Sequence, residues 1–338
     1  MVLKKRFFGL IEQLQEFLNL GDQLKKNAPP PVKSEKRTAG RDLVKSIKPA
    51  GSVRSEFLGL SFAGFHKVSY QDWIPENVQT ASTSKPPLIC VHGLTRNSHD
   101  FDKLAAQMSK KRRVICPDIV GRGQSDWFEN GAQYENIQYN ADMNALIARI
   151  GAGTVDWLGT SMGGLIGMML AASNKSPIRR LILNDIGPYL SYDALKTIGD
   201  YVGRAPEFED LAEAELYLRQ IHVQFAPMRD EDWREMARKG TRKLSSGKFI
   251  LNYDPKIGDP VRASLGGIDI NLWPLWDMIK CPVLVIRGAQ SKLLTPEITK
   301  EMQQRGPGVE VIEIEGAGHA PTLNTPKEIK LIEKWLNN

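Results

Sequence analysis

Short apolar runs alternate with amphipathic stretches along most of the chain from residue 88 onward. The runs are four to six residues long and suit buried strands, at residues 88–91, 113–116, 154–158, 178–183, 282–286 and 309–314. The stretches between them have helical spacing, at about residues 99–109, 139–150, 165–172, 296–304 and 326–336. This alternation predicts an α/β fold with a mostly parallel central sheet and helices on both faces. Two short strands joined around Gly64, between residues 57 and 70, are expected near the sheet edge.

The alternation is interrupted after the sixth predicted strand. Residues 189–275 are helix-like and rich in charge, and their 87 positions are too many for a connecting loop. We therefore expect an inserted helical cap there. The α/β core would then comprise residues 55–188 and 276–338.

The N-terminal region has a different pattern. Apolar residues in positions 1–26 recur at helical spacing, which predicts an amphipathic helix, and the proline-containing stretch 27–54 is expected to be a linker. Acidic residues such as Glu12 argue against a signal or transit peptide. We expect the helix to dock on the body or to mediate self-association, with attachment to a membrane or other apolar surface as the alternative.

The charge distribution and the cysteine content indicate which partners and which cellular compartment to expect. The net charge of +6 arises from residues 1–54, which hold 12 Lys/Arg and five Asp/Glu, whereas the remainder has 33 and 34. No nucleic-acid module accompanies this charge, so no nucleic-acid partner is expected. No apolar run reaches the ~18–20 residues of a membrane span. Cys90, Cys116 and Cys281 lie in strand-like runs without metal spacing, which favours free thiols, no metal site and a cytoplasmic location.

A candidate nucleophile lies at a strand-to-helix junction. Residues 159–163 read Gly-Thr-Ser-Met-Gly and fit G-x-S-x-G, between a predicted strand and an apolar helix. Only small neighbours tolerate so sharp a turn, and the turn raises the Ser161 hydroxyl at a helix N-terminus. The sequence therefore predicts a nucleophilic Ser161.

Five histidines are candidates for the base that a serine nucleophile needs. His319 follows the last predicted strand, and the carboxyl ends of parallel strands share one sheet edge, so it can meet Ser161. His66 is expected on the opposite flank and His222 in the cap. His92 and His99 border the expected oxyanion loop, where a structural or pocket-lining role is favoured. His319 is therefore the predicted base.

The oxyanion donors should be backbone N–H groups. One is expected from Met162, which follows the nucleophile, and the second from Leu94 in the loop after the strand at 88–91. Gly93 would let the main chain approach closely. By contrast, the glycine-containing loop at residues 121–126 lacks the full G-x-G-x-x-G pattern and no helix start follows it, which excludes a nucleotide site.

From about residue 55 to 338 the chain resembles the α/β-hydrolase superfamily. The resemblance rests on His92-Gly93, on the motif around Ser161 and on Gly318-His319, which occur in the family's order. It implies the family fold and a Ser/His site, but it does not specify the substrate. The aspartate that replaces the serine in haloalkane dehalogenases and epoxide hydrolases is absent, which argues against those activities.

The resemblance also implies a triad acid. Many relatives have an aspartate after the strand that follows the cap, but residues 287–294 contain no carboxylate and include Lys292. Some members carry the acid after the preceding strand, where this chain has Asp185. A turn-capping role before Gly187-Pro188 is the alternative for Asp185, and Glu297 is a third candidate for the acid.

We therefore predict an esterase- or lipase-like serine hydrolase with a small acyl substrate, an acyl-enzyme intermediate and no cofactor. Acyl transfer and carbon–carbon bond hydrolysis would use the same residues, and a non-catalytic binding protein of this fold is the alternative outside enzymes. Three cap-region tryptophans could line an apolar substrate pocket, alternatively forming the cap's own core: Trp233, Trp273 and Trp276.

Overall fold

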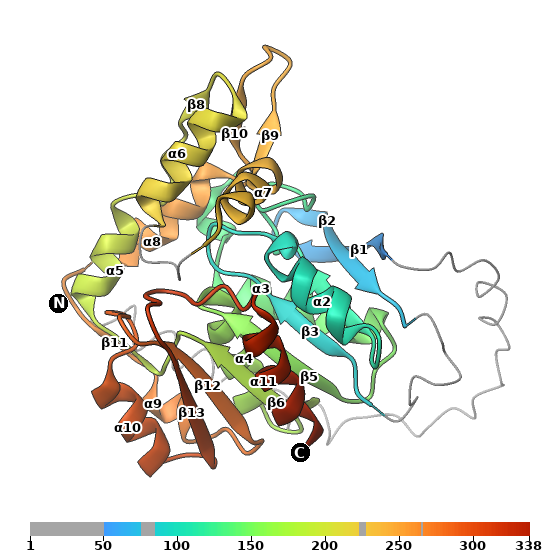
Figure 1. The fold of residues 1–338 in the computed structure, drawn as a ribbon, viewed down its shortest axis with the longest axis vertical. Coiled ribbons are helices and arrows are strands. Elements are labelled where there is room, and N and C mark those ends of the chain that lie inside the picture. The colour runs from blue at the N-terminus through green and yellow to red at the C-terminus, as the bar shows by residue number, and fades with distance from the viewer. Residues whose placement is uncertain (1–50, 76–84, 223–227, 265) are drawn as a thin grey trace, which may run out of the picture. The chain divides into compact units, whose positions relative to one another are not determined.

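An eight-stranded sheet forms the centre of the fold, with the strand order β1-β2-β4-β3-β5-β6-β12-β13 (Figure 1). The structure is a computed structural model that describes residues 51–75, 85–222, 228–264 and 266–338. The six strands from β4 to β13 are parallel. They are β3 (Leu88–Val91), β4 (Val114–Pro117), β5 (Val155–Thr160), β6 (Ile178–Asn184), β12 (Val283–Gly288) and β13 (Val309–Ile314). The predicted α/β fold with a mostly parallel sheet is confirmed.

The first two strands form an antiparallel hairpin at the sheet edge. Strands β1 (Ser52–Ser61) and β2 (Gly64–Trp73) pair over their ten residues each, so they are longer than the short strands expected. Strand β1 also begins within residues 27–54, where a linker was predicted. Only Gly59 of β1 is buried, so this edge strand lacks the apolar alternation by which a strand is recognised.

Two apolar layers cover the two faces of the sheet. Leu88 and Cys90 of β3 pack in one cluster, whereas Ile89 and Val91 pack in the other, because successive strand side chains point to opposite faces. Helices α2 (Asp102–Met108) and α11 (Pro326–Asn337) contribute to the first layer. The second layer includes α3 (Asn136–Arg149), α4 (Met162–Ala172) and α10 (Pro296–Gln304). Cys90 and Cys116 are buried free thiols, and Cys281 is a partly buried one.

Local capping explains several helix starts. Helix α11 begins with a complete capping box between Thr325 and Glu328, and the Thr295 side chain caps α10. The helix predicted at residues 99–109 is instead split into a 3₁₀ turn, η1 (Ser98–Phe101), and the shorter α2. The Asn97 side chain accepts a hydrogen bond from the His99 N–H, which fixes the start of this turn at the end of the loop that follows β3.

Residues 189–275, called the cap segment below, leave the core after β6 and return before β12. At their base, β7 (Tyr189–Leu190) pairs with β11 (Ile270–Asn271). The segment contains helices α5 (Tyr192–Gly199), α6 (Leu211–Ile221), α7 (Asp230–Gly240) and α8 (Gly258–Ser264). It is not all helical as expected, because β8 (Glu207–Phe208), β9 (Thr241–Lys243) and β10 (Phe249–Leu251) form a small sheet. Each of these strands is only two or three residues long, which is too short for an alternating pattern to reveal it in the sequence.

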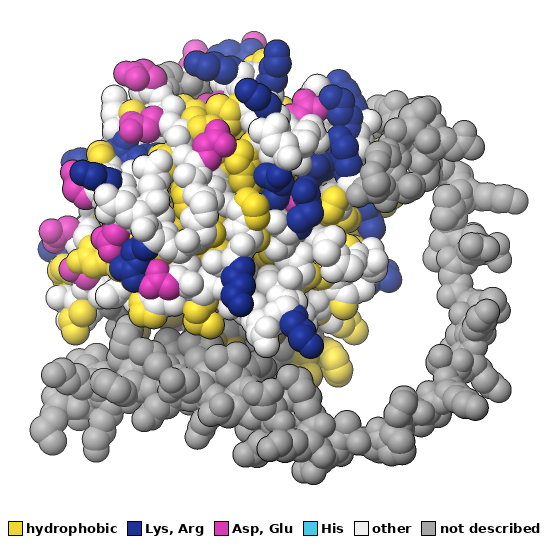
Figure 2. Space-filling model, turned by 90° about the horizontal axis from the view of Figure 1, so that it is seen from below, with side chains coloured by type: hydrophobic (Ala, Val, Ile, Leu, Met, Phe, Trp, Pro, Cys, Tyr) yellow, Lys and Arg dark blue, Asp and Glu magenta, His cyan; other side chains and the backbone are white. Residues whose placement is uncertain are grey.

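The surface and the ends of the chain bear on the predicted partners. Basic and acidic side chains both occur on the face that Figure 2 shows, so this face is not a continuous basic surface. Within the described ranges, the structure contains no helix long and apolar enough to cross a bilayer. The helix predicted at residues 1–26 and most of the predicted linker lie outside the described residues.

Candidate active site

The chain turns sharply at Ser161, between β5 and α4. Ser161 has φ 51° and ψ −113°, a left-handed conformation that a non-glycine residue rarely adopts. The flanking glycines are sterically required, because a Cβ atom on Gly159 would lie 2.2 Å from the backbone of Gly163, and one on Gly163 would lie 2.1 Å from the Val91 carbonyl oxygen. The sequence pattern therefore produces the nucleophile-elbow geometry at Ser161.

The loop after β13 brings His319 to this turn. His319 Nε2 lies 3.0 Å from Ser161 Oγ, and His319 Nδ1 lies 2.7 Å from Asp185 Oδ2. Because a carboxylate accepts hydrogen bonds, Nδ1 carries the proton and Nε2 is left with a lone pair facing the serine hydroxyl. The arrangement can remove a proton from Ser161 and stabilise the imidazolium that results.

Asp185 lies at the end of β6 and is fully buried. Its Oδ1 accepts a hydrogen bond from the Gly288 N–H at 2.8 Å, and Oδ2 accepts one from Ser291 Oγ at 2.6 Å. These side-chain contacts reach the loop after β12 and His319, not the turn at Gly187-Pro188, so they differ from those of a turn cap. Glu297, the third candidate for the acid, is exposed, and so is Lys292. A hydrogen bond from the Thr295 side chain lowers the pKa of Glu297.

Two neighbouring side chains that the sequence analysis did not single out support this geometry. Asn184 Nδ2 donates to Thr160 Oγ1 at 3.0 Å and to the Pro321 carbonyl at 2.8 Å, which joins the turn at Ser161 to the His319 loop. Ser291 occupies the loop in which many relatives carry their aspartate, and its hydroxyl contacts the carboxylate of Asp185 instead. In the sequence, this arrangement is indicated by the absence of a carboxylate from residues 287–294 together with the presence of Asp185 after the preceding strand.

The loop after β3 lies beside Ser161. A Cβ atom on Gly93 would lie 3.9 Å from Ser161 Cβ, so the main chain passes close to the hydroxyl. The fully buried His92 braces this loop: Nδ1 donates to the Gly93 carbonyl at 2.7 Å, and Nε2 accepts from the Ile119 N–H at 3.0 Å. Burial lowers the pKa of His92 to about 4, so the ring is neutral at pH 7.

The two predicted oxyanion donors belong to residues at the start of a helix and in the loop after β3. Met162 is the first residue of α4, and the first N–H groups of a helix have no intrahelical acceptor. The Leu94 N–H belongs to the peptide group between Gly93 and Leu94, and the carbonyl oxygen of this group accepts the hydrogen bond from His92 Nδ1. Buried Arg122 connects the two segments, since Nε donates to the Leu94 carbonyl at 2.9 Å and Nη2 contacts Met162 Sδ at 3.6 Å. Arg122 lies in the glycine-containing loop at residues 121–126, and no motif in the sequence points to this role for it.

His222 lies at the end of α6 in the cap segment and is buried. Burial and the nearby positive charges of Arg96 and His319 hold the pKa of His222 well below its usual value. Arg96 belongs to the loop that follows β3 and forms a bidentate ion pair with Asp100. The remaining histidines lie elsewhere: His66 Nε2 is 3.0 Å from the Asp142 carboxylate, and His99 contacts Asp102.

Comparison with known proteins is consistent with this geometry. A family model described as the alpha/beta hydrolase fold matches residues 86–326. The chain is an α/β hydrolase. The predicted family and enzyme class are therefore confirmed.

Individual relatives extend over most of the hydrolase. This chain is 42% identical over 287 residues to a 3-hydroxybutyrate-oligomer hydrolase of Cupriavidus necator, and the match covers 82% of this chain and 94% of the relative. It is 27% identical to a 2-(acetamidomethylene)succinate hydrolase of Mesorhizobium japonicum, over 75% of this chain and 89% of the relative. The crystal structure of an alpha/beta hydrolase from Novosphingobium aromaticivorans superimposes with a TM-score of 0.76 at 35% identity, over 85% and 99% of the two chains.

The three tryptophans considered as substrate contacts have other neighbours in the hydrolase. The Trp276 side chain is fully buried, and its Nε1 donates to the Arg305 carbonyl at 3.0 Å. Arg305 also stacks on Trp273, and Arg219 stacks on Trp233. A fully buried ring has no exposed surface for a substrate in this conformation, which favours the packing alternative for Trp276. Trp233 and Trp273 are each more than nine-tenths buried.

We expect Trp276→Ala to destabilise the hydrolase by about 3–5 kcal/mol, because it removes a large side chain and leaves a cavity. The relative rates on esters of different acyl length should be unchanged in the folded protein. Urea unfolding and a series of p-nitrophenyl esters measure the two effects. A changed acyl-length preference at normal stability would contradict the packing role.

We expect His92→Phe to lower kcat by about 10- to 100-fold with little change in KM, because the oxyanion forms only in the transition state. The His92 ring holds the Gly93–Leu94 peptide and polarises it through the Gly93 carbonyl. Steady-state kinetics on a soluble ester measures the effect. His66→Phe is the matched control, since it removes a buried histidine remote from Ser161 and should lower stability while leaving kcat near normal.

Proposed function

We propose that this α/β hydrolase is a serine esterase that cleaves esters of short hydroxy acids through an acyl-enzyme intermediate. The continuous contact from Ser161 through His319 to Asp185, at 3.0 and 2.7 Å, is the observation that carries the proposal. No cofactor takes part in the proposed reaction.

In the first half of the reaction, Ser161 Oγ attacks the ester carbonyl carbon while His319 Nε2 takes the hydroxyl proton. The carboxylate of Asp185 stabilises the imidazolium, and its own orientation is held by Gly288 and Ser291. The backbone N–H groups of Leu94 and Met162 donate hydrogen bonds to the carbonyl oxygen, which becomes negatively charged. Loss of one such donor typically costs about 3–4 kcal/mol of transition-state stabilisation.

The tetrahedral intermediate then collapses to an acyl-Ser161 ester. His319 gives its proton to the leaving alkoxide, so the alcohol departs neutral. A water molecule next loses a proton to His319 and attacks the acyl carbon. Collapse of the second tetrahedral intermediate releases the carboxylic acid and restores the Ser161 hydroxyl.

The proposed substrate class rests on sequence similarity to a named enzyme. The relative from Cupriavidus necator acts, by its name, on 3-hydroxybutyrate oligomers, and its identity to this chain is 42% over nearly its whole length. Such oligomers are esters whose acyl and alcohol parts are the same short hydroxy acid. A Ser–His–Asp site can hydrolyse this bond without further chemistry.

The test uses the full chain with a 3-hydroxybutyrate dimer and trimer, and ethyl butyrate as a control ester of similar acyl length. We expect release of 3-hydroxybutyrate, with kcat/KM at least about tenfold higher for the trimer than for ethyl butyrate. Hydrolysis of ethyl butyrate alone would overturn the substrate class. Failure to cleave all three esters and an aryl ester would overturn the esterase proposal.

Acyl transfer and carbon–carbon bond hydrolysis are the alternatives for the same residues. Adding a competing alcohol to the ester assay separates transfer from hydrolysis, because transfer yields a new ester at the expense of free acid. Mass spectrometry of the denatured enzyme after rapid quenching detects the acyl-Ser161 adduct, which the proposed mechanism requires.

A further inference from the structure

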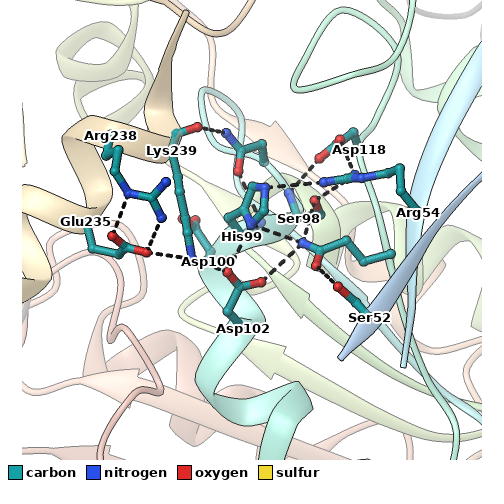
Figure 3. Close-up of polar contacts among 12 residues, drawn as sticks. Ser52, Arg54, Ser98, His99, Asp100, Asp102, Asp118, Glu235, Arg238 and Lys239 are labelled. Carbon is teal, nitrogen blue, oxygen red and sulfur yellow. Dashed lines mark hydrogen bonds and ion pairs between the residues drawn. The ribbon is translucent and has the colours of Figure 1, made fainter. Parts of the chain in front are cut away.

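A polar pocket of about 240 Å³ lies between the core and the cap segment. Arg54 of β1 approaches from one side, Arg238 and Lys239 of α7 approach from the other, and His99 lies between them (Figure 3). The loop between β3 and η1 connects this region to the candidate active site. The first residues of this loop, including Gly93, pass Ser161, and the loop ends at Ser98 and His99, the first residues of η1, which belong to the cluster around the pocket.

The cations at this pocket retain hydrogen-bonding capacity. Arg54 donates to Asp118 and Ser98 and contacts His99, which uses three of the five guanidinium N–H groups. Lys239 contacts Asp102 and Glu235, and Arg238 binds Glu235 through Nε and Nη2. Each cation therefore has a donor beyond those used in these ion pairs. The carboxylates of Asp102 and Glu235 are not part of the pocket lining.

Asp118 is the acidic residue among the described residues that line the pocket, and its oxygens are already engaged. Oδ1 accepts a hydrogen bond from the Ser98 N–H at 2.7 Å. Oδ2 accepts from Arg54 Nη1 at 2.8 Å and from the Gln124 N–H at 3.0 Å. Its side chain is 1% exposed. Its carboxylate is therefore already paired, and the described residues that line the pocket comprise three cations, Arg54, Arg238 and Lys239, and this one carboxylate.

The size and the other lining groups indicate what kind of anion fits. Liquid water occupies about 30 Å³ per molecule, so this pocket exceeds the space that one inorganic ion needs. Gln124, Thr241 and Asn252 add amide and hydroxyl groups to the lining. Arginine favours the planar, two-oxygen geometry of carboxylates and the oxygens of phosphates. The lining therefore suits a small, hydroxylated organic oxyanion.

We propose that the pocket between Arg54, His99, Arg238 and Lys239 binds a small hydroxylated organic anion. The acidic group contacts the cations of β1 and α7, and the hydroxyl faces Thr241 and Asn252. A ligand held in this way joins the core to the cap segment, alongside the hydrogen bond from Asn97 Nδ2 to the Lys239 carbonyl at 2.9 Å. This binding is independent of the proposed ester hydrolysis.

Calorimetric titration of the full chain carrying Ser161→Ala tests the site without turnover. The probes are 3-hydroxybutyrate, glycerol 3-phosphate and the neutral butane-1,3-diol. We expect one of the two anions to bind with a Kd of about 1 mM or tighter, and the diol not to bind. The stronger anion identifies the acidic group as carboxylate or phosphate. Absence of binding by both anions at about 10 mM would overturn the proposal.

Substitutions then locate the bound anion. Arg238→Gln should weaken binding by about tenfold, because a charge-assisted hydrogen bond is lost. Arg238 is 60% exposed, so this change should leave the melting temperature nearly unaltered. Arg229→Gln is the matched control: Arg229 precedes α7 and pairs with Asp232, and its loss should leave binding unchanged. Equal affinity in the Arg238 variant and in its parent would place the anion elsewhere, for example at the candidate active site, and overturn the assignment.

Discussion

Ser161→Ala should lower kcat for ester hydrolysis by about 10⁶-fold, since removal of a triad serine leaves only substrate binding and oxyanion stabilisation. The fold should persist, because the substitution removes one hydroxyl and keeps the small side chain that the strained turn between β5 and α4 requires. Hydrolysis of a p-nitrophenyl ester measures the loss. A fluorophosphonate probe should label the wild-type protein and not the variant.

Ser173→Ala is the control for this experiment. Ser173 lies at the other end of the same helix, where its hydroxyl donates to the Met169 carbonyl. We expect normal turnover and normal labelling in that variant. Turnover by Ser161→Ala close to the wild-type rate would remove the serine mechanism, whatever the probe reacts with.

The second large effect is expected from Asp185→Asn, which should lower kcat by about 10⁴-fold. An amide at this position can donate to His319 Nδ1, and the ring then carries its proton on Nε2. Nε2 could no longer accept the Ser161 proton. Ser291→Ala removes only one hydroxyl contact to Asp185, so it should lower kcat by about tenfold at most.

Asp142→Asn is the matched control for the acid. Asp142 is also buried and also lies at hydrogen-bond distance from a histidine, His66, but at a different part of the fold. We expect this variant to lose stability while its folded fraction keeps normal turnover. If Asp185→Asn behaved in the same way, with a lower melting temperature and near-normal kcat, its role would be structural.

The sequence predicted the strands and helices best where an apolar pattern or a helix cap marks the element. We expected a helix at residues 296–304 and a strand at residues 309–314, and α10 and β13 have those bounds. The start of the helix was predictable because Thr295-Pro296 is a typical helix start. Strand β1 was only partly predicted. Its side chains are mostly outside the core, so pairing with β2, and not an apolar pattern, determines its extent.

The candidate site could be predicted where chain order alone was informative. Ser161 and His319 follow predicted parallel strands, whose carboxyl ends meet at one edge, and the structure brings their side chains to 3.0 Å. The contact between Ser291 and Asp185 joins positions 106 residues apart, and no local pattern encodes it. Likewise, sequence cannot tell whether a tryptophan faces a cavity or its own core, since both environments are apolar.

The pairing of β7 with β11 places the two ends of the cap segment side by side. A segment that departs and returns at adjacent points can grow, shrink or be exchanged without changing the spacing of the strands that hold Asp185 and His319. The cap segment can therefore change in evolution while the core residues proposed to carry out the reaction stay the same. For protein engineering, this base is the natural junction at which to graft the cap of one homologue onto the catalytic frame of another.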